Sequence, residues 1–148
     1  MSARHKIDEV LTQFAHQIGL PELSLVNNEL SLVFDDILRV HIIFHSEINA
    51  VQLESEVVDL KAVNSDLCRS LLAFNNHWSD FGVFFGLDNH REVLCLHKIL
   101  NIETFDYTCF ESSLAELISQ SESWMSLLTA FENNEQGISE PNHEDLKV

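Results

Sequence analysis

Apolar residues recur along this chain with two different periods, and the change of period separates helices from strands. In residues 2–18 they recur every three to four positions, which is the spacing of an amphipathic helix. Gly19 follows this stretch and Pro21 blocks its continuation, as at a helix C-terminus. The apolar stripe of this first helix consists of Ile7, Val10, Leu11, Phe14 and Ile18.

Three stretches after the first helix alternate apolar and polar residues, which predicts β-strands with a core side and a wetter side. Asp35 and Asp36 suit a tight turn between the first two of them. The predicted strands are 30–34 (LSLVF), 37–45 (ILRVHIIFH) and 50–58 (AVQLESEVV).

The second half of the chain predicts a helix, a hairpin and a longer helix. Residues 64–66 (NSD) offer N-cap chemistry for a helix over 65–78. Residues 81–100 read as a β-hairpin that turns at about 88–90, and a 3–4 spacing of apolar residues predicts a helix over 107–131. The predicted order is therefore α-βββ-α-ββ-α.

The first strand of that hairpin, FGVFFGLD, has apolar side chains or bare backbone on both faces. A period of two places two sets on opposite faces: Phe81, Val83, Phe85 and Leu87 on one, and Gly82, Phe84 and Gly86 on the other. Glycine inside a strand often marks a close approach of another backbone. The C-terminal helix can cover one face, so the other is left for a second layer or subunit. We expect a two-fold dimer that buries this hairpin and the helix at 65–78.

Length and composition fit one globular domain, and the net charge limits the classes of molecule that it can bind. The 148 residues are 45% hydrophobic, and 8 Lys and Arg oppose 24 Asp and Glu, giving a formal net charge of −16. Such a surface repels phosphate backbones and anionic lipid, so we expect neither nucleic acid nor stable membrane association. It favours basic or mixed-charge polypeptides, or alternatively only keeps the protein in solution.

Two further features concern the setting and the ends of the chain. No run approaches the roughly 20 apolar residues of a transmembrane helix, and the N-terminus MSARHKIDEV has no apolar signal region. The three cysteines show no CxxC spacing, which favours a reducing, cytosolic setting. Residues 133–148 are acidic without apolar anchors, so we predict a folded domain over 1–132 and a disordered tail.

The sequence contains only weak signals for a metal site or a catalytic site. His41 and His45 share a strand face but would lie roughly 13 Å apart, too far for one zinc ion, so no metal or other cofactor is expected. Cys68, Cys95 and Cys109 lie in apolar patterns that favour inert burial over a nucleophile. Nucleotide-binding, hydrolase and metalloprotease motifs are not found, so we do not expect an enzyme.

One long stretch carries a resemblance to a known family. In LCRSLLAFNNHWSDFGVFFGLDNHREVLCLHKIL, an LL-x-x-N helix end, a G-x-x-x-G-L-D strand and a VLCL return strand follow one another. A closing helix, SSLAELISQSESW, has a Trp near its end. With the element order, the size and the acidity, these motifs resemble the class I type III secretion chaperones of the Tir-chaperone family, over about residues 3–131.

The resemblance implies an α+β fold, with an antiparallel sheet packed with helices, in a cytosolic bacterial homodimer without enzymatic activity. Such chaperones hold the N-terminal chaperone-binding segment of a secreted effector in an extended, soluble and export-competent form. The alternative is a dimeric regulatory or interaction module of the same fold without a secretion client.

The resemblance also implies where partners bind. The dimer would be built from the second helix and the fourth strand, and the client would contact the first helix and the sheet, adding one strand. The expected dimer-interface residues are Leu71, Leu72, Phe74, Gly82, Phe84 and Gly86. The expected client-binding residues are Ile7, Val10, Leu11, Phe14, Ile18, Leu32 and Phe34. We expect Val10 and Phe14 to be more exposed positions of the stripe and 30–34 to be an edge strand; alternatively, the stripe is only core.

Overall fold

Five strands and four α-helices form an α+β fold, in a computed structural model that describes residues 2–138 and side chains up to residue 130. The strands are β1 (Glu29–Phe34), β2 (Leu38–His45), β3 (Ala50–Asp59), β4 (Phe84–Asp88) and β5 (Val93–Asn101). The helices are α1 (Ala3–Ile18), α2 (Ser65–Asn75), α3 (Trp78–Phe81) and α4 (Tyr107–Ile138), with short 3-10 segments at Leu60–Ala62 and Ile102–Thr104. All pairings are antiparallel and the strand order is β1-β2-β3-β5-β4, so β1 and β4 are the edges.

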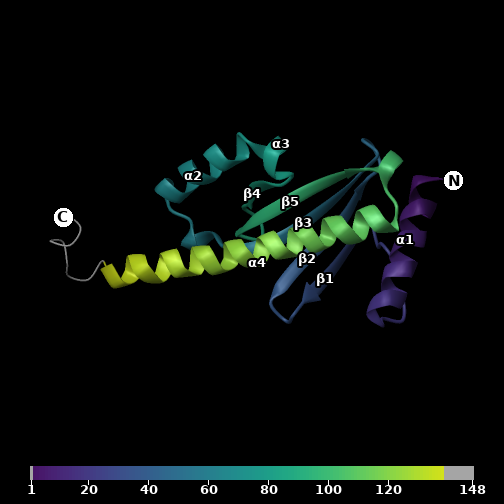
Figure 1. Ribbon diagram of the computed structural model, residues 1–148, viewed down its shortest axis with the longest axis horizontal. Coiled ribbons are helices and arrows are strands. Elements are labelled where there is room, and N and C mark those ends of the chain that lie inside the picture. Colours follow the sequence, from purple (N-terminus) through teal and green to yellow (C-terminus); the bar gives the residue numbers. More distant parts are fainter. Residues whose placement is uncertain (1, 139–148) are drawn as a thin grey trace.

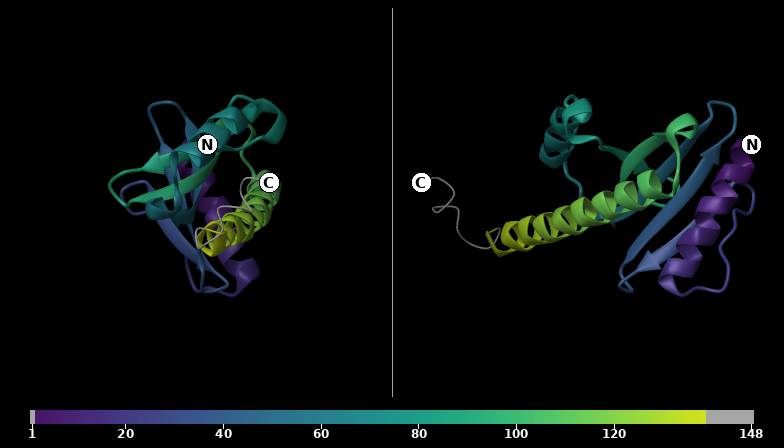
Figure 2. Two further views of the ribbon diagram at one scale, coloured as in Figure 1. Left: turned by 90° about the vertical axis from the view of Figure 1, so that its left-hand side faces the viewer. Right: turned by 45° about the vertical axis from the view of Figure 1, so that its right-hand side comes forward.

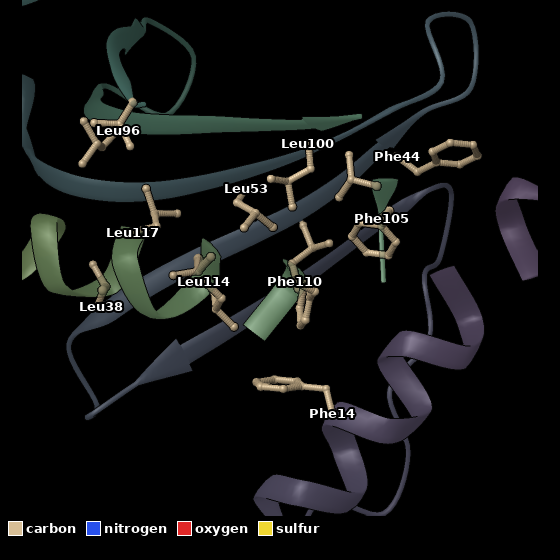
Figure 3. Close-up of a cluster of buried hydrophobic side chains, with 14 of the residues drawn as sticks. Phe14, Leu38, Phe44, Leu53, Leu96, Leu100, Phe105, Phe110, Leu114 and Leu117 are labelled. Atoms are coloured by element: carbon tan, nitrogen blue, oxygen red, sulfur yellow. The ribbon is translucent and has the colours of Figure 1, made fainter. Parts of the chain in front are cut away.

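One face of the sheet packs against α4, which crosses it and contacts β2, β3 and β5 (Figure 1). Strand residues that alternate onto this face are buried, among them Val40, Leu53 and Leu96. From α1, Phe14 meets the ring of Phe110 on α4 edge-on, with ring centroids 5.3 Å apart (Figure 3). The alternation predicted for β2 and β3 is therefore confirmed, and α1, α4 and this sheet face share one core.

Left-handed two-residue turns hold β1 at both ends. Asn27 and Asn28 have φ of 54° and 63°, and Asp35 and Asp36 have φ of 54° and 61°. Asn and Asp tolerate this backbone region better than other non-glycine residues. The turn predicted at Asp35 and Asp36 is confirmed, and Asn27 and Asn28 add a second turn before the strand.

The helix predicted over 65–78 is instead two helices. α2 ends at Asn75, and the short α3 begins at Trp78. Trp78 continues the apolar spacing of α2, but its side chain is 60% exposed. The spacing therefore did not mark a continuous buried stripe.

The first hairpin strand is also shorter than predicted, because β4 begins at Phe84 instead of Phe81. Phe81 belongs to α3 and stacks on Phe74 of α2 at 4.3 Å. Gly82 is not a strand residue: with φ of 73° it ends α3 in the left-handed conformation that glycine adopts without strain. Of the face predicted to be apolar, Val83 and Phe85 are buried, whereas Phe81 and Leu87 are 44% and 50% exposed.

The last helix is longer than predicted. α4 continues to Ile138, past the boundary at residue 132 that the sequence placed between domain and tail. Figure 2 shows that its distal half extends beyond the sheet. The rest of the predicted tail, residues 139–148, lies outside the described residues. Within residues 2–138, no helix is long and apolar enough to cross a membrane.

Candidate partner-binding surfaces

The backbone of the edge strand β1 presents hydrogen-bonding groups outward. The amide of Phe44 donates to the carbonyl of Asn28 at 2.8 Å, so these two residues form a hydrogen-bonded pair. Bonded and non-bonded pairs alternate along an antiparallel ladder. Because the register pairs β1 with β2 residue by residue, the N–H and C=O groups of Glu29, Ser31 and Val33 point away from β2.

Part of this outward edge is already occupied. Glu29 exchanges two backbone hydrogen bonds with Val26, at 2.9 and 3.1 Å, across the turn that precedes β1. Within the described part of the chain, Ser31 and Val33 have no such backbone partner on this side. The edge therefore offers two consecutive outward residues to an incoming strand. The prediction that 30–34 is an edge strand is confirmed.

The predicted client-binding residues divide into buried and accessible ones. Ile18 is 44% exposed, and Leu32 and Phe34 are partly buried against the core. Val10 and Phe14 are each 5% exposed, so the expectation that they are more exposed positions of the stripe is wrong, because α4 covers this part of α1. The stripe residues that the structure places inside the core are Ile7, Val10, Leu11 and Phe14.

A second surface lies between α2 and β4. An apolar pocket of about 260 Å³ opens there, next to Leu72, which is 69% exposed, and Leu87. Trp78 and Phe81 of the adjoining α3 are also exposed. The pocket is lined by Cys68, Leu71, Leu72, Asn75, Phe85, Gly86, Leu87 and Leu94.

The predicted dimer-interface residues have unequal access to this surface. Leu72 is available, whereas Leu71 is buried below it. Phe74 is engaged within the chain, since its ring also meets Phe85 and Trp124 at 5.2 and 5.4 Å. The remaining three are Gly82, which ends α3, and Phe84 and Gly86, which lie beside His97.

The glycine at position 86 has an explanation within one chain. A Cβ built on Gly86 would lie 2.7 Å from Nε2 of His97, a distance that real Cβ atoms do not tolerate. The His97 ring stacks on Phe84, with centroids 5.1 Å apart. The sequence predicted that another backbone would approach the bare backbone of Gly86. In the structure, the imidazole of His97 on the neighbouring strand covers it instead.

The sheet face that bears His97 carries a ladder of polar side chains bonded across the strands. His41 lies between Ser31 and Glu56, with both contacts at 2.6 Å. Gln52 connects His45 to His97, because its Oε1 lies 2.7 Å from Nε2 of His45 and its Nε2–H donates to Nδ1 of His97 at 2.8 Å. Each of these side chains bonds to a neighbour, which satisfies polar groups on a face where His41 and Glu54 are buried.

Arg91, from the turn between β4 and β5, joins three carboxylates to this ladder. Its guanidinium pairs with Glu54, with Glu56 at 2.8 Å and with Asp88 at 2.7 Å. The backbone and side-chain hydrogen bonds from Arg91 lower the pKa of Asp88 to about 2. Burial alone would raise the pKa of Glu56, but hydrogen bonds from His41 and Arg91 outweigh it and hold that pKa below 4.5.

Burial shifts the pKa of two further groups on this face. It lowers the pKa of His97 below 6.5, and the donor from Gln52 also suits the neutral ring. Burial raises the pKa of the Cys95 thiol to about 12, so the expected inert burial is confirmed for this cysteine. Cys68 and Cys109 are partly exposed instead, because each lies at the margin of its helix stripe. Among the described residues, no group of His, Cys, Asp and Glu could hold a metal ion.

Comparison with known proteins supports the resemblance seen in the sequence. ExsC of Pseudomonas aeruginosa, a transcriptional anti-antiactivator, is 32% identical over 136 residues, which are 91% of this chain and 94% of ExsC. A crystal structure of the ExsC–ExsE complex contains a chain that is 33% identical and superposes with a TM-score of 0.83, over 86% of this chain and 97% of that one.

More distant structures share the fold. A chain in the HopA1–SchA chaperone–effector complex is 14% identical, with a TM-score of 0.73 over 84% of this chain and 96% of that one.

The Tir chaperone protein (CesT) family matches residues 9–125. This match begins within α1, spans β1 to β5 with α2 and α3, and ends within α4. The chain therefore belongs to the Tir chaperone protein (CesT) family.

Proposed function

We propose that this protein is a cytoplasmic type III secretion chaperone. It binds the N-terminal chaperone-binding segment of a secreted effector and keeps that segment extended, soluble and competent for export. The observation that carries the proposal is the similarity, at 33% identity and a TM-score of 0.83, to a chain of the ExsC–ExsE complex. The chaperone family to which the chain belongs is non-catalytic in general, and we propose no catalytic role.

The client would bind along β1. Ser31 and Val33 supply outward backbone groups for an added strand, and Leu32 and Phe34 supply partly buried apolar surface beside it. Ile18 on α1 extends the apolar surface. The net charge of −16 favours basic residues that flank the client's apolar anchors, and it would raise the association rate in a salt-dependent way.

The chaperone would act as a homodimer. The exposed Leu72 and Leu87 and the apolar pocket between α2 and β4 form a continuous apolar surface, of a kind that marks an interface. Light scattering at micromolar concentration should give twice 16.9 kDa. A mass near 16.9 kDa would rule the dimer out.

A proline substitution on β1 tests the client site. The protein would be purified from its native cell with an affinity tag, and its co-purifying clients identified by mass spectrometry. Val33→Pro removes an outward N–H that β2 does not use, a position where an edge strand accepts proline. Val33→Thr is the matched control, since it changes the side chain and retains the N–H.

We expect Val33→Thr to retain the client and Val33→Pro to lose it, with both variants folded by circular dichroism. If Val33→Pro binds the identified client as tightly as the wild type, no strand is added at β1. If the wild type carries no secreted protein, the chaperone function itself is wrong.

A second candidate is transcriptional regulation through protein binding. ExsC is a transcriptional anti-antiactivator, and its similarity extends over 91% of this chain. Deleting the gene distinguishes the two functions. Loss of the client's export with unchanged transcription of secretion genes favours the chaperone, and a fall in their transcription favours a regulatory role.

A further inference from the structure

The last residue of α2, Asn75, makes two hydrogen bonds to the backbone of β4. Its Oδ1 accepts from the N–H of Phe85 at 2.7 Å, and its Nδ2–H donates to the C=O of Phe85 at 2.9 Å. A carboxamide carries the same donor and acceptor as a peptide group. The side chain therefore reproduces one hydrogen-bonded pair of an antiparallel ladder, in the place where a neighbouring strand would lie.

The two bonds identify the outer side of β4. The N–H and C=O of Phe85 point toward α2. Because these groups alternate in direction along a strand, the N–H and C=O of Phe84 and Gly86 point toward β5, and those of Leu87 point outward again. The outer edge of β4 thus has two consecutive outward residues, as β1 has at Ser31 and Val33. Asn75 occupies the first of them.

The geometry of the two edges points to a specific role for this residue. We propose that Asn75 closes the edge of β4 to strand addition, which leaves β1 as the edge that accepts an extended segment. The first half of this proposal stands on the contacts of Asn75 alone, and the second half rests on the proposed function. Contacts across the surface of α2 and β4 would then be made by side chains and not by extension of the sheet.

Two observations explain why the edge of β4 needs to be closed and what keeps Asn75, the cap of this edge, in place. The exposed Leu72 and Leu87 flank it, so an unprotected β4 would attract an apolar strand from another molecule. Phe74, next to Asn75, packs against Phe81 at 4.3 Å and Trp124 at 5.4 Å, which fixes the end of α2 over β4. The LL-x-x-N motif ends at this asparagine.

Hydrogen exchange measured by NMR tests the cap without any client. In Asn75→Ala, the amide of Phe85 should exchange about tenfold faster or more, while the amide of Gly86, bonded to β5, should change little. Asn75→Asp keeps an acceptor for this N–H but places a second carboxylate oxygen against the C=O of Phe85, so protection at Phe85 should lie between those of the wild type and Asn75→Ala. Asn76→Ala is the matched control, because Asn76 is the exposed C-cap residue that follows Asn75. Equal acceleration at Phe85 and Gly86, or none at Phe85, would overturn the proposal.

Analytical ultracentrifugation tests whether the uncapped edge accepts a strand. Asn75→Ala should form larger, concentration-dependent assemblies that the wild type and Asn76→Ala do not form. Adding Leu87→Pro removes the second outward N–H and leaves only that of Phe85, so an added strand would lose its pair of consecutive bonding residues and the assemblies should be abolished. Adding Leu87→Thr should not abolish them, and Leu87→Pro alone provides the reference. Unchanged assembly of a folded Asn75→Ala, or assemblies that persist with Leu87→Pro, would show that Asn75 does not guard this edge. Neither result bears on whether a client binds β1.

Discussion

Replacing Gly86 with alanine should destabilise the protein through one identified neighbour. The new Cβ would lie 2.7 Å from Nε2 of His97, so the imidazole has to move. The ring cannot move freely, because it stacks on Phe84 and accepts a hydrogen bond from Gln52. The cost of the substitution is therefore the loss of these two contacts.

The expected magnitude follows from the two contacts. Losing the hydrogen bond from Gln52 costs about 1 kcal/mol, and losing the ring stack costs about 1 kcal/mol. Alanine restricts the unfolded chain and returns about 0.5 kcal/mol. The net destabilisation is about 1.5 kcal/mol, within the usual range for overpacking. For a chain of this size it should lower Tm by about 5 °C.

A double-mutant cycle with His97→Ala isolates the contact. Thermal unfolding should be followed at one fixed protein concentration, because dimerisation would make Tm depend on concentration. Once the ring is absent, Gly86→Ala should be neutral or stabilise by about 0.5 kcal/mol. Equal destabilisation in both backgrounds would refute the reasoning and favour a role for Gly86 in contact with a second subunit.

Further predictions concern the core, the pH dependence and α1. Phe110→Ala removes a fully buried ring at the junction of α1 and α4, and should lower the free energy of unfolding by about 3–5 kcal/mol in urea titrations. The folded state holds the pKa of His97 below the value of 6.5 in the unfolded chain, so it binds fewer protons, and stability should fall as pH drops below about 6.5. His97→Gln should flatten this slope in denaturation curves at pH 5 to 8; an unchanged slope would assign it to other groups. Val10→Asp should unfold the protein because it buries an unpaired charge, whereas Ile18→Asp should remain folded by circular dichroism and weaken client binding. A folded Val10→Asp would show that α1 is not packed as described.

The elements that the sequence predicted well are those with one buried face. β2 alternates because Leu38, Val40 and Ile42 face the core, and a shift of one residue would expose them all. The end of α2 was missed because its cause is not local. Asn75 is bonded to Phe85, ten residues further on, while the apolar spacing continues to Trp78.

The candidate sites were harder to predict than the fold. The spacing of apolar residues shows which face of α1 is apolar, but not that α4 covers most of that face. The sequence therefore predicts accessible positions at Val10 and Phe14, which the structure buries. The polar ladder was missed because its members are far apart in the chain. Gln52 and His97 are separated by 45 residues, and their contact depends on the pairing of β3 with β5.

The two left-handed turns around β1 affect how the loss of conformational entropy on client binding is divided between this protein and the client. Asn27–Asn28 and Asp35–Asp36 fix the strand at both ends, so Ser31 and Val33 already hold the spacing that an added strand requires. At the proposed client site, the chaperone would then lose little conformational entropy on binding, and the ordering cost would fall on the client segment. A mutation that loosens either turn would weaken binding by making the edge flexible before the client arrives.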